Sequence, residues 1–289
     1  MKTFSYESMG THWEISIYKD SHCNFKEIEK EIVAMSQEFD QTYSRFIRTS
    51  LVWKIAEKAG TYEVPQDFIN MLQLYRDLYK PSGKKLNPLV GFTISDLGYD
   101  DQYSLVAKDT IRKTPDLFET VKLHNGDHCA IETTEPVLFD FGALGKGYFV
   151  DKITDYLKEK GIEHFLVNGS GDIYYYGDEP IEVGLEHPDN PSLVIGKMLI
   201  KNGAMCASGI NRRKWGKHHH VIDPHKNASR NEDIKATWVI AQNAALSDAL
   251  ASCLFFAPPE NFATYSFEYV IMNSENAVKV SHDWNVELY

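Results

Sequence analysis

The sequence lacks a long apolar run, is poor in cysteine and carries fewer basic than acidic residues. Across its 289 residues no stretch approaches the roughly 20 apolar residues that cross a bilayer, and no apolar segment follows Lys2. We therefore expect no membrane insertion, no secretory signal and a cytoplasmic location. The 4 cysteines are widely spaced without a CxxC pair, which argues against a disulfide framework or a zinc knuckle. A net charge of −11 argues against nucleic-acid binding, but it leaves room for a local basic pocket.

The apolar residues that are present follow helix and strand periodicities. Spacings of three and four predict helices, and Pro65 suits the start of one while Gly161 suits the end of another. These helices are expected over about 25–39, 68–79, 146–160 and 244–256. Strands are expected at about 11–18, 163–168, 171–176, 181–186, 193–201, 236–241 and 267–273.

The middle of the chain has weaker periodicity. Residues 83–105 are punctuated by Gly, Asn and Pro and are predicted to form a functional loop. Residues 104–139 are predicted to form short strands with turns at Asn125-Gly126 and near Pro136. With no internal repeat or low-complexity linker, this mixture predicts the α+β class, with mixed or antiparallel sheets flanked by helices.

The segment from Asp140 to Asp151 is the richest in chemistry. Three of its glycines precede or enter a predicted helix, and Lys146 stands at the turn. Glycine lets a backbone approach a ligand closely, a helix N-terminus attracts anions, and a lysine adds positive charge for a phosphate. The spacing is that of neither a Walker loop nor a dinucleotide-binding G-x-G-x-x-G. These residues alone are equally compatible with a phosphate site and with a plain strand-to-helix turn.

Two further segments carry polar residues between glycines or on strands. In 167–173, a nucleotide-contacting loop and a β-turn capped by Asp172 are both open. Three adjacent histidines follow at 218–220, but on a strand His218 and His220 share a face while His219 points away. Two imidazoles are too few for a closed zinc site, so one histidine acting as a proton acceptor is the more attractive role.

Asp248 and Ser252 stand four residues apart in a predicted helix and therefore share a face. A carboxylate and a hydroxyl together suit a hard cation that prefers oxygen ligands. The alternative is a helix N-terminus at which Asp248 complements the helix dipole.

Taken in order, these segments resemble the ApbE-type FAD:protein FMN transferases across nearly the whole chain, which implies a single domain over 1–289 with that family's fold. The matching elements keep the family's order. They are Met9-Gly10-Thr11 (M-G-T), Ser44-Arg45-Phe46 (S-R-F), Asn87 to Gly91 (D-P-x-x-G), Asp140 to Asp151 (D-x-G-A/G-x-A/G-K-G-x-x-x-D), Asn168 to Ile173 (N-x-G-G-D-I), Ala207-Ser208-Gly209 (T/S-S-G), His219 to Pro224 (H-H-I-x-D-P) and Ser247 to Ser252 (A-D-A-L-A-T).

The resemblance implies a role for each matching residue. Asp248, the Ser252 hydroxyl and the Ala143 carbonyl would hold Mg²⁺, and His220 would be the catalytic base, with Asp248 also counted as catalytic. The residues implied in binding FAD are Met9, Ser44, Lys146, Asp151, Gly169, Asp172, Ser208, Gly209 and Asp223.

The resemblance also implies a reaction. FMN would pass from FAD to a Ser or Thr hydroxyl of an acceptor flavoprotein, with release of AMP. The acceptor would carry a D-x-x-(S/T)-G-A-(S/T)-like segment and, without an export signal on the enzyme, would be cytoplasmic. A metal-dependent FAD pyrophosphatase, a non-catalytic flavin-binding protein and a zinc-stabilised structural protein stay as alternatives.

Four positions depart from the family pattern. Asn87 stands where the family has Asp, Ser170 where it has Gly, and Ser252 where it has Thr; the R-x-G that often follows D-P is absent after Pro224. Ser252 keeps the hydroxyl that a cation needs.

Overall fold

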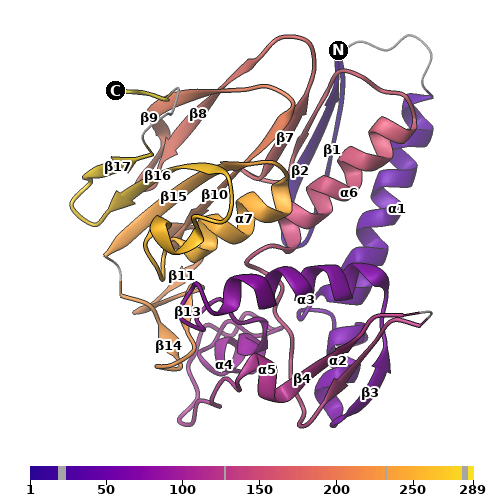
Figure 1. Cartoon of the computed structure of the whole chain (residues 1–289), viewed down its shortest axis with the longest axis vertical. Helices are drawn as coiled ribbons and strands as arrows, with labels where there is room; N and C mark the ends of the chain where they lie inside the picture. Colours follow the sequence, from indigo (N-terminus) through magenta and orange to yellow (C-terminus); the bar gives the residue numbers. More distant parts are fainter. Residues whose placement is uncertain (19–23, 127, 232, 282–285) are drawn as a thin grey trace.

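The computed structural model describes residues 1–18, 24–126, 128–231, 233–281 and 286–289. An eight-stranded sheet crosses the upper part of the molecule in Figure 1, and every pairing within it is antiparallel. In order across the sheet its strands are β1 (Lys2–Ser8), β2 (Thr11–Ile17), β6 (Phe165–Asn168), β7 (Ile173–Tyr176), β10 (Gly203–Gly209), β15 (Ile234–Ala241), β16 (Phe267–Asn273) and β17 (Val278–Val280).

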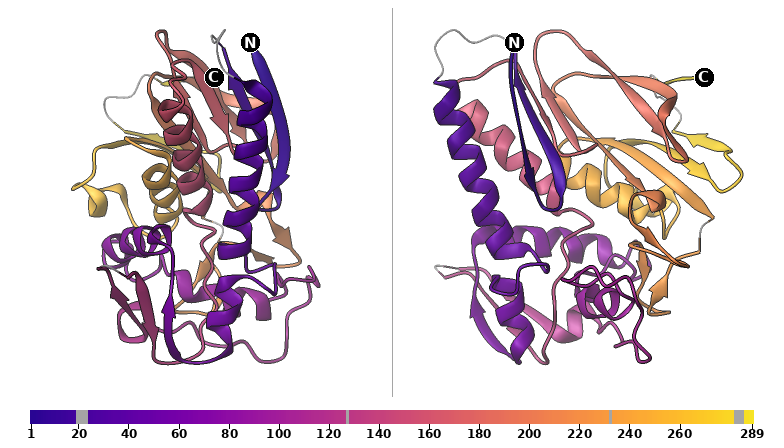
Figure 2. Two further views of the ribbon diagram at one scale, coloured as in Figure 1. Left: turned by 90° about the vertical axis from the view of Figure 1, so that its right-hand side faces the viewer. Right: turned by 180° about the vertical axis from the view of Figure 1, so that it is seen from behind.

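Helices cover one face of this sheet (Figures 1 and 2). They are α1 (Phe25–Tyr43), α6 (Gly145–Glu159) and α7 (Ala244–Cys253), with α3 (Gln66–Tyr79) crossing below them. Each is amphipathic: in α1, for example, Ile28, Ile32 and Phe39 are buried at helical spacing. Together with alternate residues of the strands, such as Val239, these helices form the largest hydrophobic core.

A second, smaller sheet covers the opposite face. Its order is β18 (Val286–Leu288), β9 (Asn190–Ile200) and β8 (Ile181–His187), and its pairings are antiparallel. Alternate side chains of the large sheet, including Tyr175 and Trp238, pack against Leu185 and Met198 in a separate core. The upper part is therefore built of three layers: helices, large sheet, small sheet.

The lower part of the molecule in Figure 1 consists of short elements. They are α2 (Leu51–Glu57), α4 (Gly91–Asp96), α5 (Leu117–Thr120), the three-stranded sheet of β3 (Gly60–Glu63), β5 (Ala130–Thr133) and β4 (Val121–His124), the 3-10 turns η1 (Pro88–Val90) and η2 (Ile210–Arg212), and the two small pairs β11 (Lys214–Trp215) with β12 (His218–His219) and β13 (Ile222–Asp223) with β14 (Ala228–Ser229). A third 3-10 turn, η3 (Pro259–Phe262), follows α7. A small core including Ile94, Tyr99 and Trp215 joins α4 to the segment around β11.

The predicted α+β class with antiparallel sheets flanked by helices is confirmed. The predicted loop over 83–105 is wrong in part, because η1 and α4 lie within it. The Asn87 side chain accepts the N–H of Leu89 at 2.9 Å, so the residues taken as loop punctuation begin a helical segment. No helix in the described part of the chain has the length and apolar character to cross a membrane. Cys129, Cys206 and Cys253 are free thiols, and Cys23 lies outside the described residues.

Candidate active site

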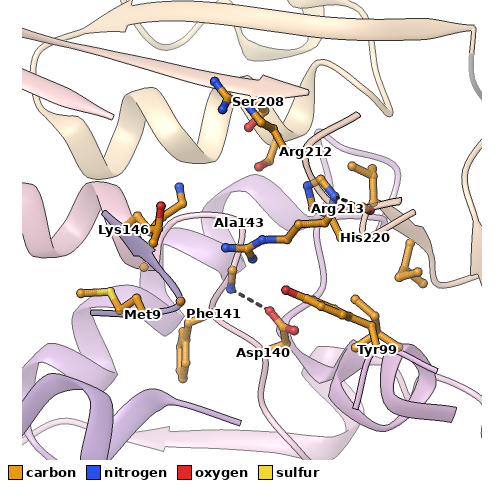
Figure 3. Close-up of a pocket in the computed structure, with 18 of the residues that line it drawn as sticks. Met9, Tyr99, Asp140, Phe141, Ala143, Lys146, Ser208, Arg212, Arg213 and His220 are labelled. Carbon is orange, nitrogen blue, oxygen red and sulfur yellow. Dashed lines mark hydrogen bonds between the residues drawn. The ribbon is translucent and has the colours of Figure 1, made fainter. Parts of the chain in front are cut away.

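A cavity of about 580 Å³ opens between the large sheet and the lower elements. Its wall combines segments that are far apart in the chain: the β1–β2 turn, the end of α1, the segment before α6, the end of β10, the segment after η2, and α7 (Figure 3). Of the residues predicted to form the site, those that line it are Met9, Ser44, Ala143, Lys146, Ser208, Gly209, His220 and Ser252.

The β1–β2 turn places Met9 at the cavity. Met9 and Gly10 have φ values of 53° and 65°, the left-handed pair that a two-residue hairpin turn requires. Asp40 at the end of α1 holds this turn, because its Oδ2 accepts the Ser8 hydroxyl at 2.8 Å and the Met9 N–H at 3.1 Å. A helix carboxylate therefore fixes the hairpin against α1, a contact that the sequence did not predict.

Arg45 anchors the segment that precedes α6. Its Nε donates to Asp140 Oδ2 at 2.5 Å and its Nη1 to the Tyr99 carbonyl at 2.5 Å, while the guanidinium lies 4.2 Å from the centroid of the Phe46 ring. The other carboxylate oxygen of Asp140 accepts the Gly142 N–H at 2.7 Å. Arg45 is 4% exposed, so in the S-R-F element it acts as a buried support for Asp140.

The most charged cluster beside the cavity consists of Lys146, which lines it, and of Asp172 and Asp248, which are buried behind the lining. The Lys146 ammonium pairs with Asp172 Oδ2 and lies 3.6 Å from Asp248 Oδ2, which also accepts the Gly147 N–H at 3.0 Å. Burial opposes the charge on Lys146, but the two carboxylates outweigh it and raise the pKa of the ammonium. Burial, together with the charge of Asp172, raises the pKa of Asp248 to about 7. Two buried carboxylates thus share one ammonium.

Helices α6 and α7 touch closely beside this cluster. A Cβ added to Gly147 would lie 2.2 Å from the Ala244 carbonyl oxygen and 2.7 Å from the Asp248 Cβ. Glycine is therefore required at this position, because any side chain would push the two helices apart. The third glycine of the 140–151 segment brings Asp248 next to Lys146.

The oxygen atoms at this wall suit a hard divalent cation. Ser252 follows Asp248 by one turn of α7, Ala143 lies on the segment before α6, and both line the cavity. Within the described ranges, Asp172 Oδ1 is buried without a hydrogen-bond partner, and the two carboxylates exceed the one ammonium in charge. The described residues contain no cluster of three His, Cys, Asp or Glu side chains that could hold a metal. Mg²⁺ commonly completes its coordination shell with waters and substrate phosphates. A site with only a few protein ligands is therefore compatible with Mg²⁺.

Asp151 lies behind the cavity wall rather than on it. Its two carboxylate oxygens accept the N–H groups of Ala244 and Ala245, each at 2.8 Å, at the start of α7. Burial raises the pKa of Asp151 to about 6. Asp151 is not among the residues that line the cavity, and its contacts position the start of α7. They also remove the alternative role of Asp248, which is the fifth residue of α7 and stands beyond the first N–H groups.

The 168–173 turn is closed by Asn168, whose Oδ1 accepts the Gly171 N–H at 3.0 Å, and by the Gly169 N–H, which donates to the Asp172 carbonyl at 2.8 Å. The Asp172 carboxylate is consequently free to pair with Lys146. Gly169 packs on Trp13, since an added Cβ would lie 2.8 Å from that ring. Although Gly169 was expected to contact FAD, it is not among the residues that line the cavity. Ser170 does line it, with a left-handed φ of 61°.

The three adjacent histidines have three different surroundings. His220 lines the cavity, and its N–H and Nδ1 lie 3.2 Å and 3.4 Å from the Arg213 carbonyl. Because a carbonyl only accepts, Nδ1 carries the hydrogen and Nε2 keeps its lone pair. Burial and the charge of Arg213 lower the pKa of His220 to about 3, so its ring is neutral. His219 is buried with Nε2 2.8 Å from the Arg230 carbonyl, and His218 packs on Trp215. The imidazoles do not converge on a metal.

Asp223 also lies outside the cavity lining. Its Oδ2 is 3.3 Å from the Lys85 ammonium, and its Oδ1 accepts the His225 N–H at 3.0 Å. Lys85 lines the cavity, so Asp223 supports a residue of the cavity lining through this ion pair. The H-H-I-x-D-P motif therefore identified in Asp223 a residue that contacts the cavity lining from behind.

The fold matches solved flavin-transferase structures. The chain superposes on the Vibrio cholerae flavin transferase ApbE with a TM-score of 0.78, 18% identity and coverage of 97% and 96% of the two chains. It superposes on the ApbE protein of Thermotoga maritima with a TM-score of 0.82, 18% identity and 97% coverage of both chains. These matches define the fold of the chain as that of the ApbE flavin-transferase structures.

The particular family follows from the sequence match. The ApbE family model matches residues 9–269, and the chain belongs to the ApbE family. A relative named FAD:protein FMN transferase from Treponema pallidum is 24% identical over 257 residues, 78% of this chain and 70% of the relative. Another of that name, from Klebsiella pneumoniae, is 29% identical over 133 residues, and the match spans 44% of this chain and 42% of the relative's length. The family and the transferase class predicted from the sequence are confirmed.

Proposed function

We propose that this protein is an FAD:protein FMN transferase that joins the FMN half of FAD to a Ser or Thr hydroxyl of an acceptor flavoprotein. The observation that carries the proposal is that Lys146 and the neutral His220 line one cavity, while the buried Asp172 and Asp248 pair with Lys146 directly behind its lining. The charge of Lys146 contributes to lowering the pKa of His220, as expected for groups that share a site. The names of the curated relatives support the choice of substrate.

Mg²⁺ would be held by the Asp248 carboxylate, the Ser252 hydroxyl and the Ala143 carbonyl. When bound, the cation supplies positive charge to the FAD diphosphate. The unpartnered Asp172 Oδ1 and the two-to-one ratio of carboxylates to ammonium support a cation here. Asp172 pairs with the Lys146 ammonium, and Lys146 lines the cavity, where its charge would neutralise part of the diphosphate charge.

The protein's own residues would move the proton. His220 Nε2 accepts the proton of the acceptor hydroxyl, whose oxygen forms a bond to the flavin-side phosphorus. The bond from that phosphorus to the bridging oxygen breaks, and AMP leaves with the electron pair. A histidine with a pKa of about 3 is a weak base in the free cavity. The negative diphosphate beside it raises that pKa, so the base gains strength once FAD is bound.

The acceptor is proposed from the family resemblance to carry a D-x-x-(S/T)-G-A-(S/T)-like segment. Two departures from the family pattern have local structural roles here. Asn87 donates from its side chain to the Pro115 carbonyl at 2.9 Å, and His225 donates its N–H to Asp223. Both stabilise turns, and the acceptor segment would lie over the remaining open side of the cavity.

A reconstituted reaction tests the proposal. The purified protein is mixed with FAD, Mg²⁺ and a polypeptide bearing such a segment, and the polypeptide's intact mass and the free nucleotides are recorded. A mass gain of one FMN with equal AMP release supports the transferase; a polypeptide with Ala at the acceptor Ser or Thr is the control. Free FMN and AMP without a mass gain would instead indicate a pyrophosphatase, and intact FAD a binding protein. Asp248→Ala should abolish metal-dependent turnover.

A further inference from the structure

Five cationic side chains line the cavity: Arg45, Lys85, Lys146, Arg212 and Arg213. Four of them are matched by carboxylates. Arg45 pairs with Asp140, Lys85 with Asp223, Lys146 with Asp172 and Asp248, and Arg212 with Glu186 at 3.0 Å. Among the residues that the structure describes, no carboxylate pairs with Arg213. Its positive charge is therefore uncompensated in the described cavity wall.

Arg213 directly follows η2 and reaches into the cavity. Its side chain extends from beside His220 toward Ala143, across the middle of the cavity (Figure 3). The residue is half-buried, and its guanidinium lies 5.9 Å from the centroid of the Tyr99 ring. Within the described ranges the guanidinium donates no hydrogen bond, although it carries five N–H donors.

The main chain of Arg213 contacts the candidate base His220. Its carbonyl accepts the His220 N–H at 3.2 Å and faces His220 Nδ1 at 3.4 Å. Arg213 therefore contacts the candidate base through its backbone and places its unpaired guanidinium in the cavity. Substitution of the side chain leaves these carbonyl contacts in place, so the two roles of Arg213 can be separated by experiment.

We infer that the Arg213 guanidinium binds the diphosphate of FAD and is the residue that selects a diphosphate over an uncharged flavin. The inference rests on the proposed function for the identity of the ligand. A planar guanidinium matches two phosphate oxygens with parallel N–H donors, which a lysine ammonium does not. A half-buried cation without a partner is unfavourable in the empty cavity, and an anionic ligand removes that penalty. Lys146 and Arg213 would then hold the diphosphate from opposite walls.

Equilibrium dialysis of FAD and of riboflavin against wild type, Arg213→Gln, Arg213→Lys and Arg212→Gln tests the inference. Riboflavin has the same ring and no phosphate. Arg213→Gln should weaken FAD binding by about 10- to 100-fold, the range for a lost hydrogen bond to a charged group, and leave riboflavin binding unchanged. Arg213→Lys should recover part of the loss, because it keeps the charge without the forked geometry. Arg212→Gln removes the same charge from a side chain already paired with Glu186, and should change FAD binding by less than about fivefold.

The outcomes separate this inference from the proposed function. Equal losses for FAD and riboflavin in Arg213→Gln would overturn it, because they would place the guanidinium on the flavin ring. Unchanged FAD binding, or an equal effect of Arg212→Gln, would overturn it as well. Selective loss of FAD binding supports it even if the wild-type protein transfers no FMN, so that failure of the transferase proposal is seen separately by intact mass. Circular dichroism of each variant confirms that the fold is kept.

Discussion

Replacing Gly147 with alanine tests the close contact between α6 and α7. Two opposing effects are expected. In an ordinary helix the change from Gly to Ala stabilises by about 1 kcal/mol through backbone propensity. At Gly147, however, the added Cβ would lie 2.2 Å from the Ala244 carbonyl oxygen, a backbone atom that cannot rotate away.

The magnitude follows from what must move. Overpacking at a helix contact costs about 1–3 kcal/mol. Separating the helices also lengthens the 3.0 Å bond from the Gly147 N–H to Asp248, and a hydrogen bond to a charged group contributes about 1.5–3 kcal/mol. We expect a net loss of roughly 3 kcal/mol, or a fall in Tm on the order of 5 °C for a chain of this size.

Thermal unfolding followed by circular dichroism measures this loss, with Gly203→Ala as the matched control. A Cβ at Gly203 meets only the Lys201 carbonyl at 3.6 Å, an ordinary contact, so that variant should unfold close to the wild-type temperature. A Gly147→Ala protein with a Tm equal to or above wild type would refute the argument, because propensity alone would then have decided the sign. The displaced Asp248 should also weaken any Mg²⁺-dependent activity in this variant.

Three further outcomes are expected. His220→Ala should slow FMN transfer by about 10²- to 10⁴-fold and leave FAD affinity unchanged in dialysis; retained transfer would remove His220 as the base. Burial raises the pKa of Asp248 from 3.8 to about 7 in the fold, so metal-free stability should fall as pH rises through that window. Asp248→Asn should flatten the decline in urea unfolding with EDTA at pH 5 and 8; an unchanged slope would contradict the assignment. Ser170→Gly should stabilise by about 1 kcal/mol, since Ser170 has a φ of 61°, and a loss in urea unfolding would argue against strain there.

The amphipathic elements were predictable because their pattern is local. Helices α1, α3, α6 and α7 and most strands of the large sheet match the predicted segments, although α7 ends at Cys253 instead of 256. The segment around Asn87 was misjudged because Asn and Pro punctuate loops and also begin helices. Strand β1 and helix α2 were not predicted from the sequence. A single domain over 1–289 and a cytoplasmic location stay predictions.

The site was predictable where chemistry is carried by short motifs. Lys146, His220 and Ser252 were identified from their spacing and the family resemblance, and they line one cavity. Asp151 and Asp223 belong to the same motifs but lie behind the cavity lining. Asp151 accepts N–H groups at the start of α7, and Asp223 pairs with Lys85. A motif marks residues that share a region, and it does not separate those that face the ligand from those that hold them.

The sequence by itself determined the periodicity, the order of the motifs and the family, because each of these depends on residues that are close together in the chain. Only the tertiary structure decided which charges are paired. Asp172 and Asp248 are 76 positions apart and meet at Lys146 because α6 and α7 touch at Gly147. Arg213 is distinguished from Arg212 by having no described carboxylate partner, which depends on the positions of acidic residues from other elements. Burial and pairing are properties of contacts between distant segments, so they arise only when the chain is folded.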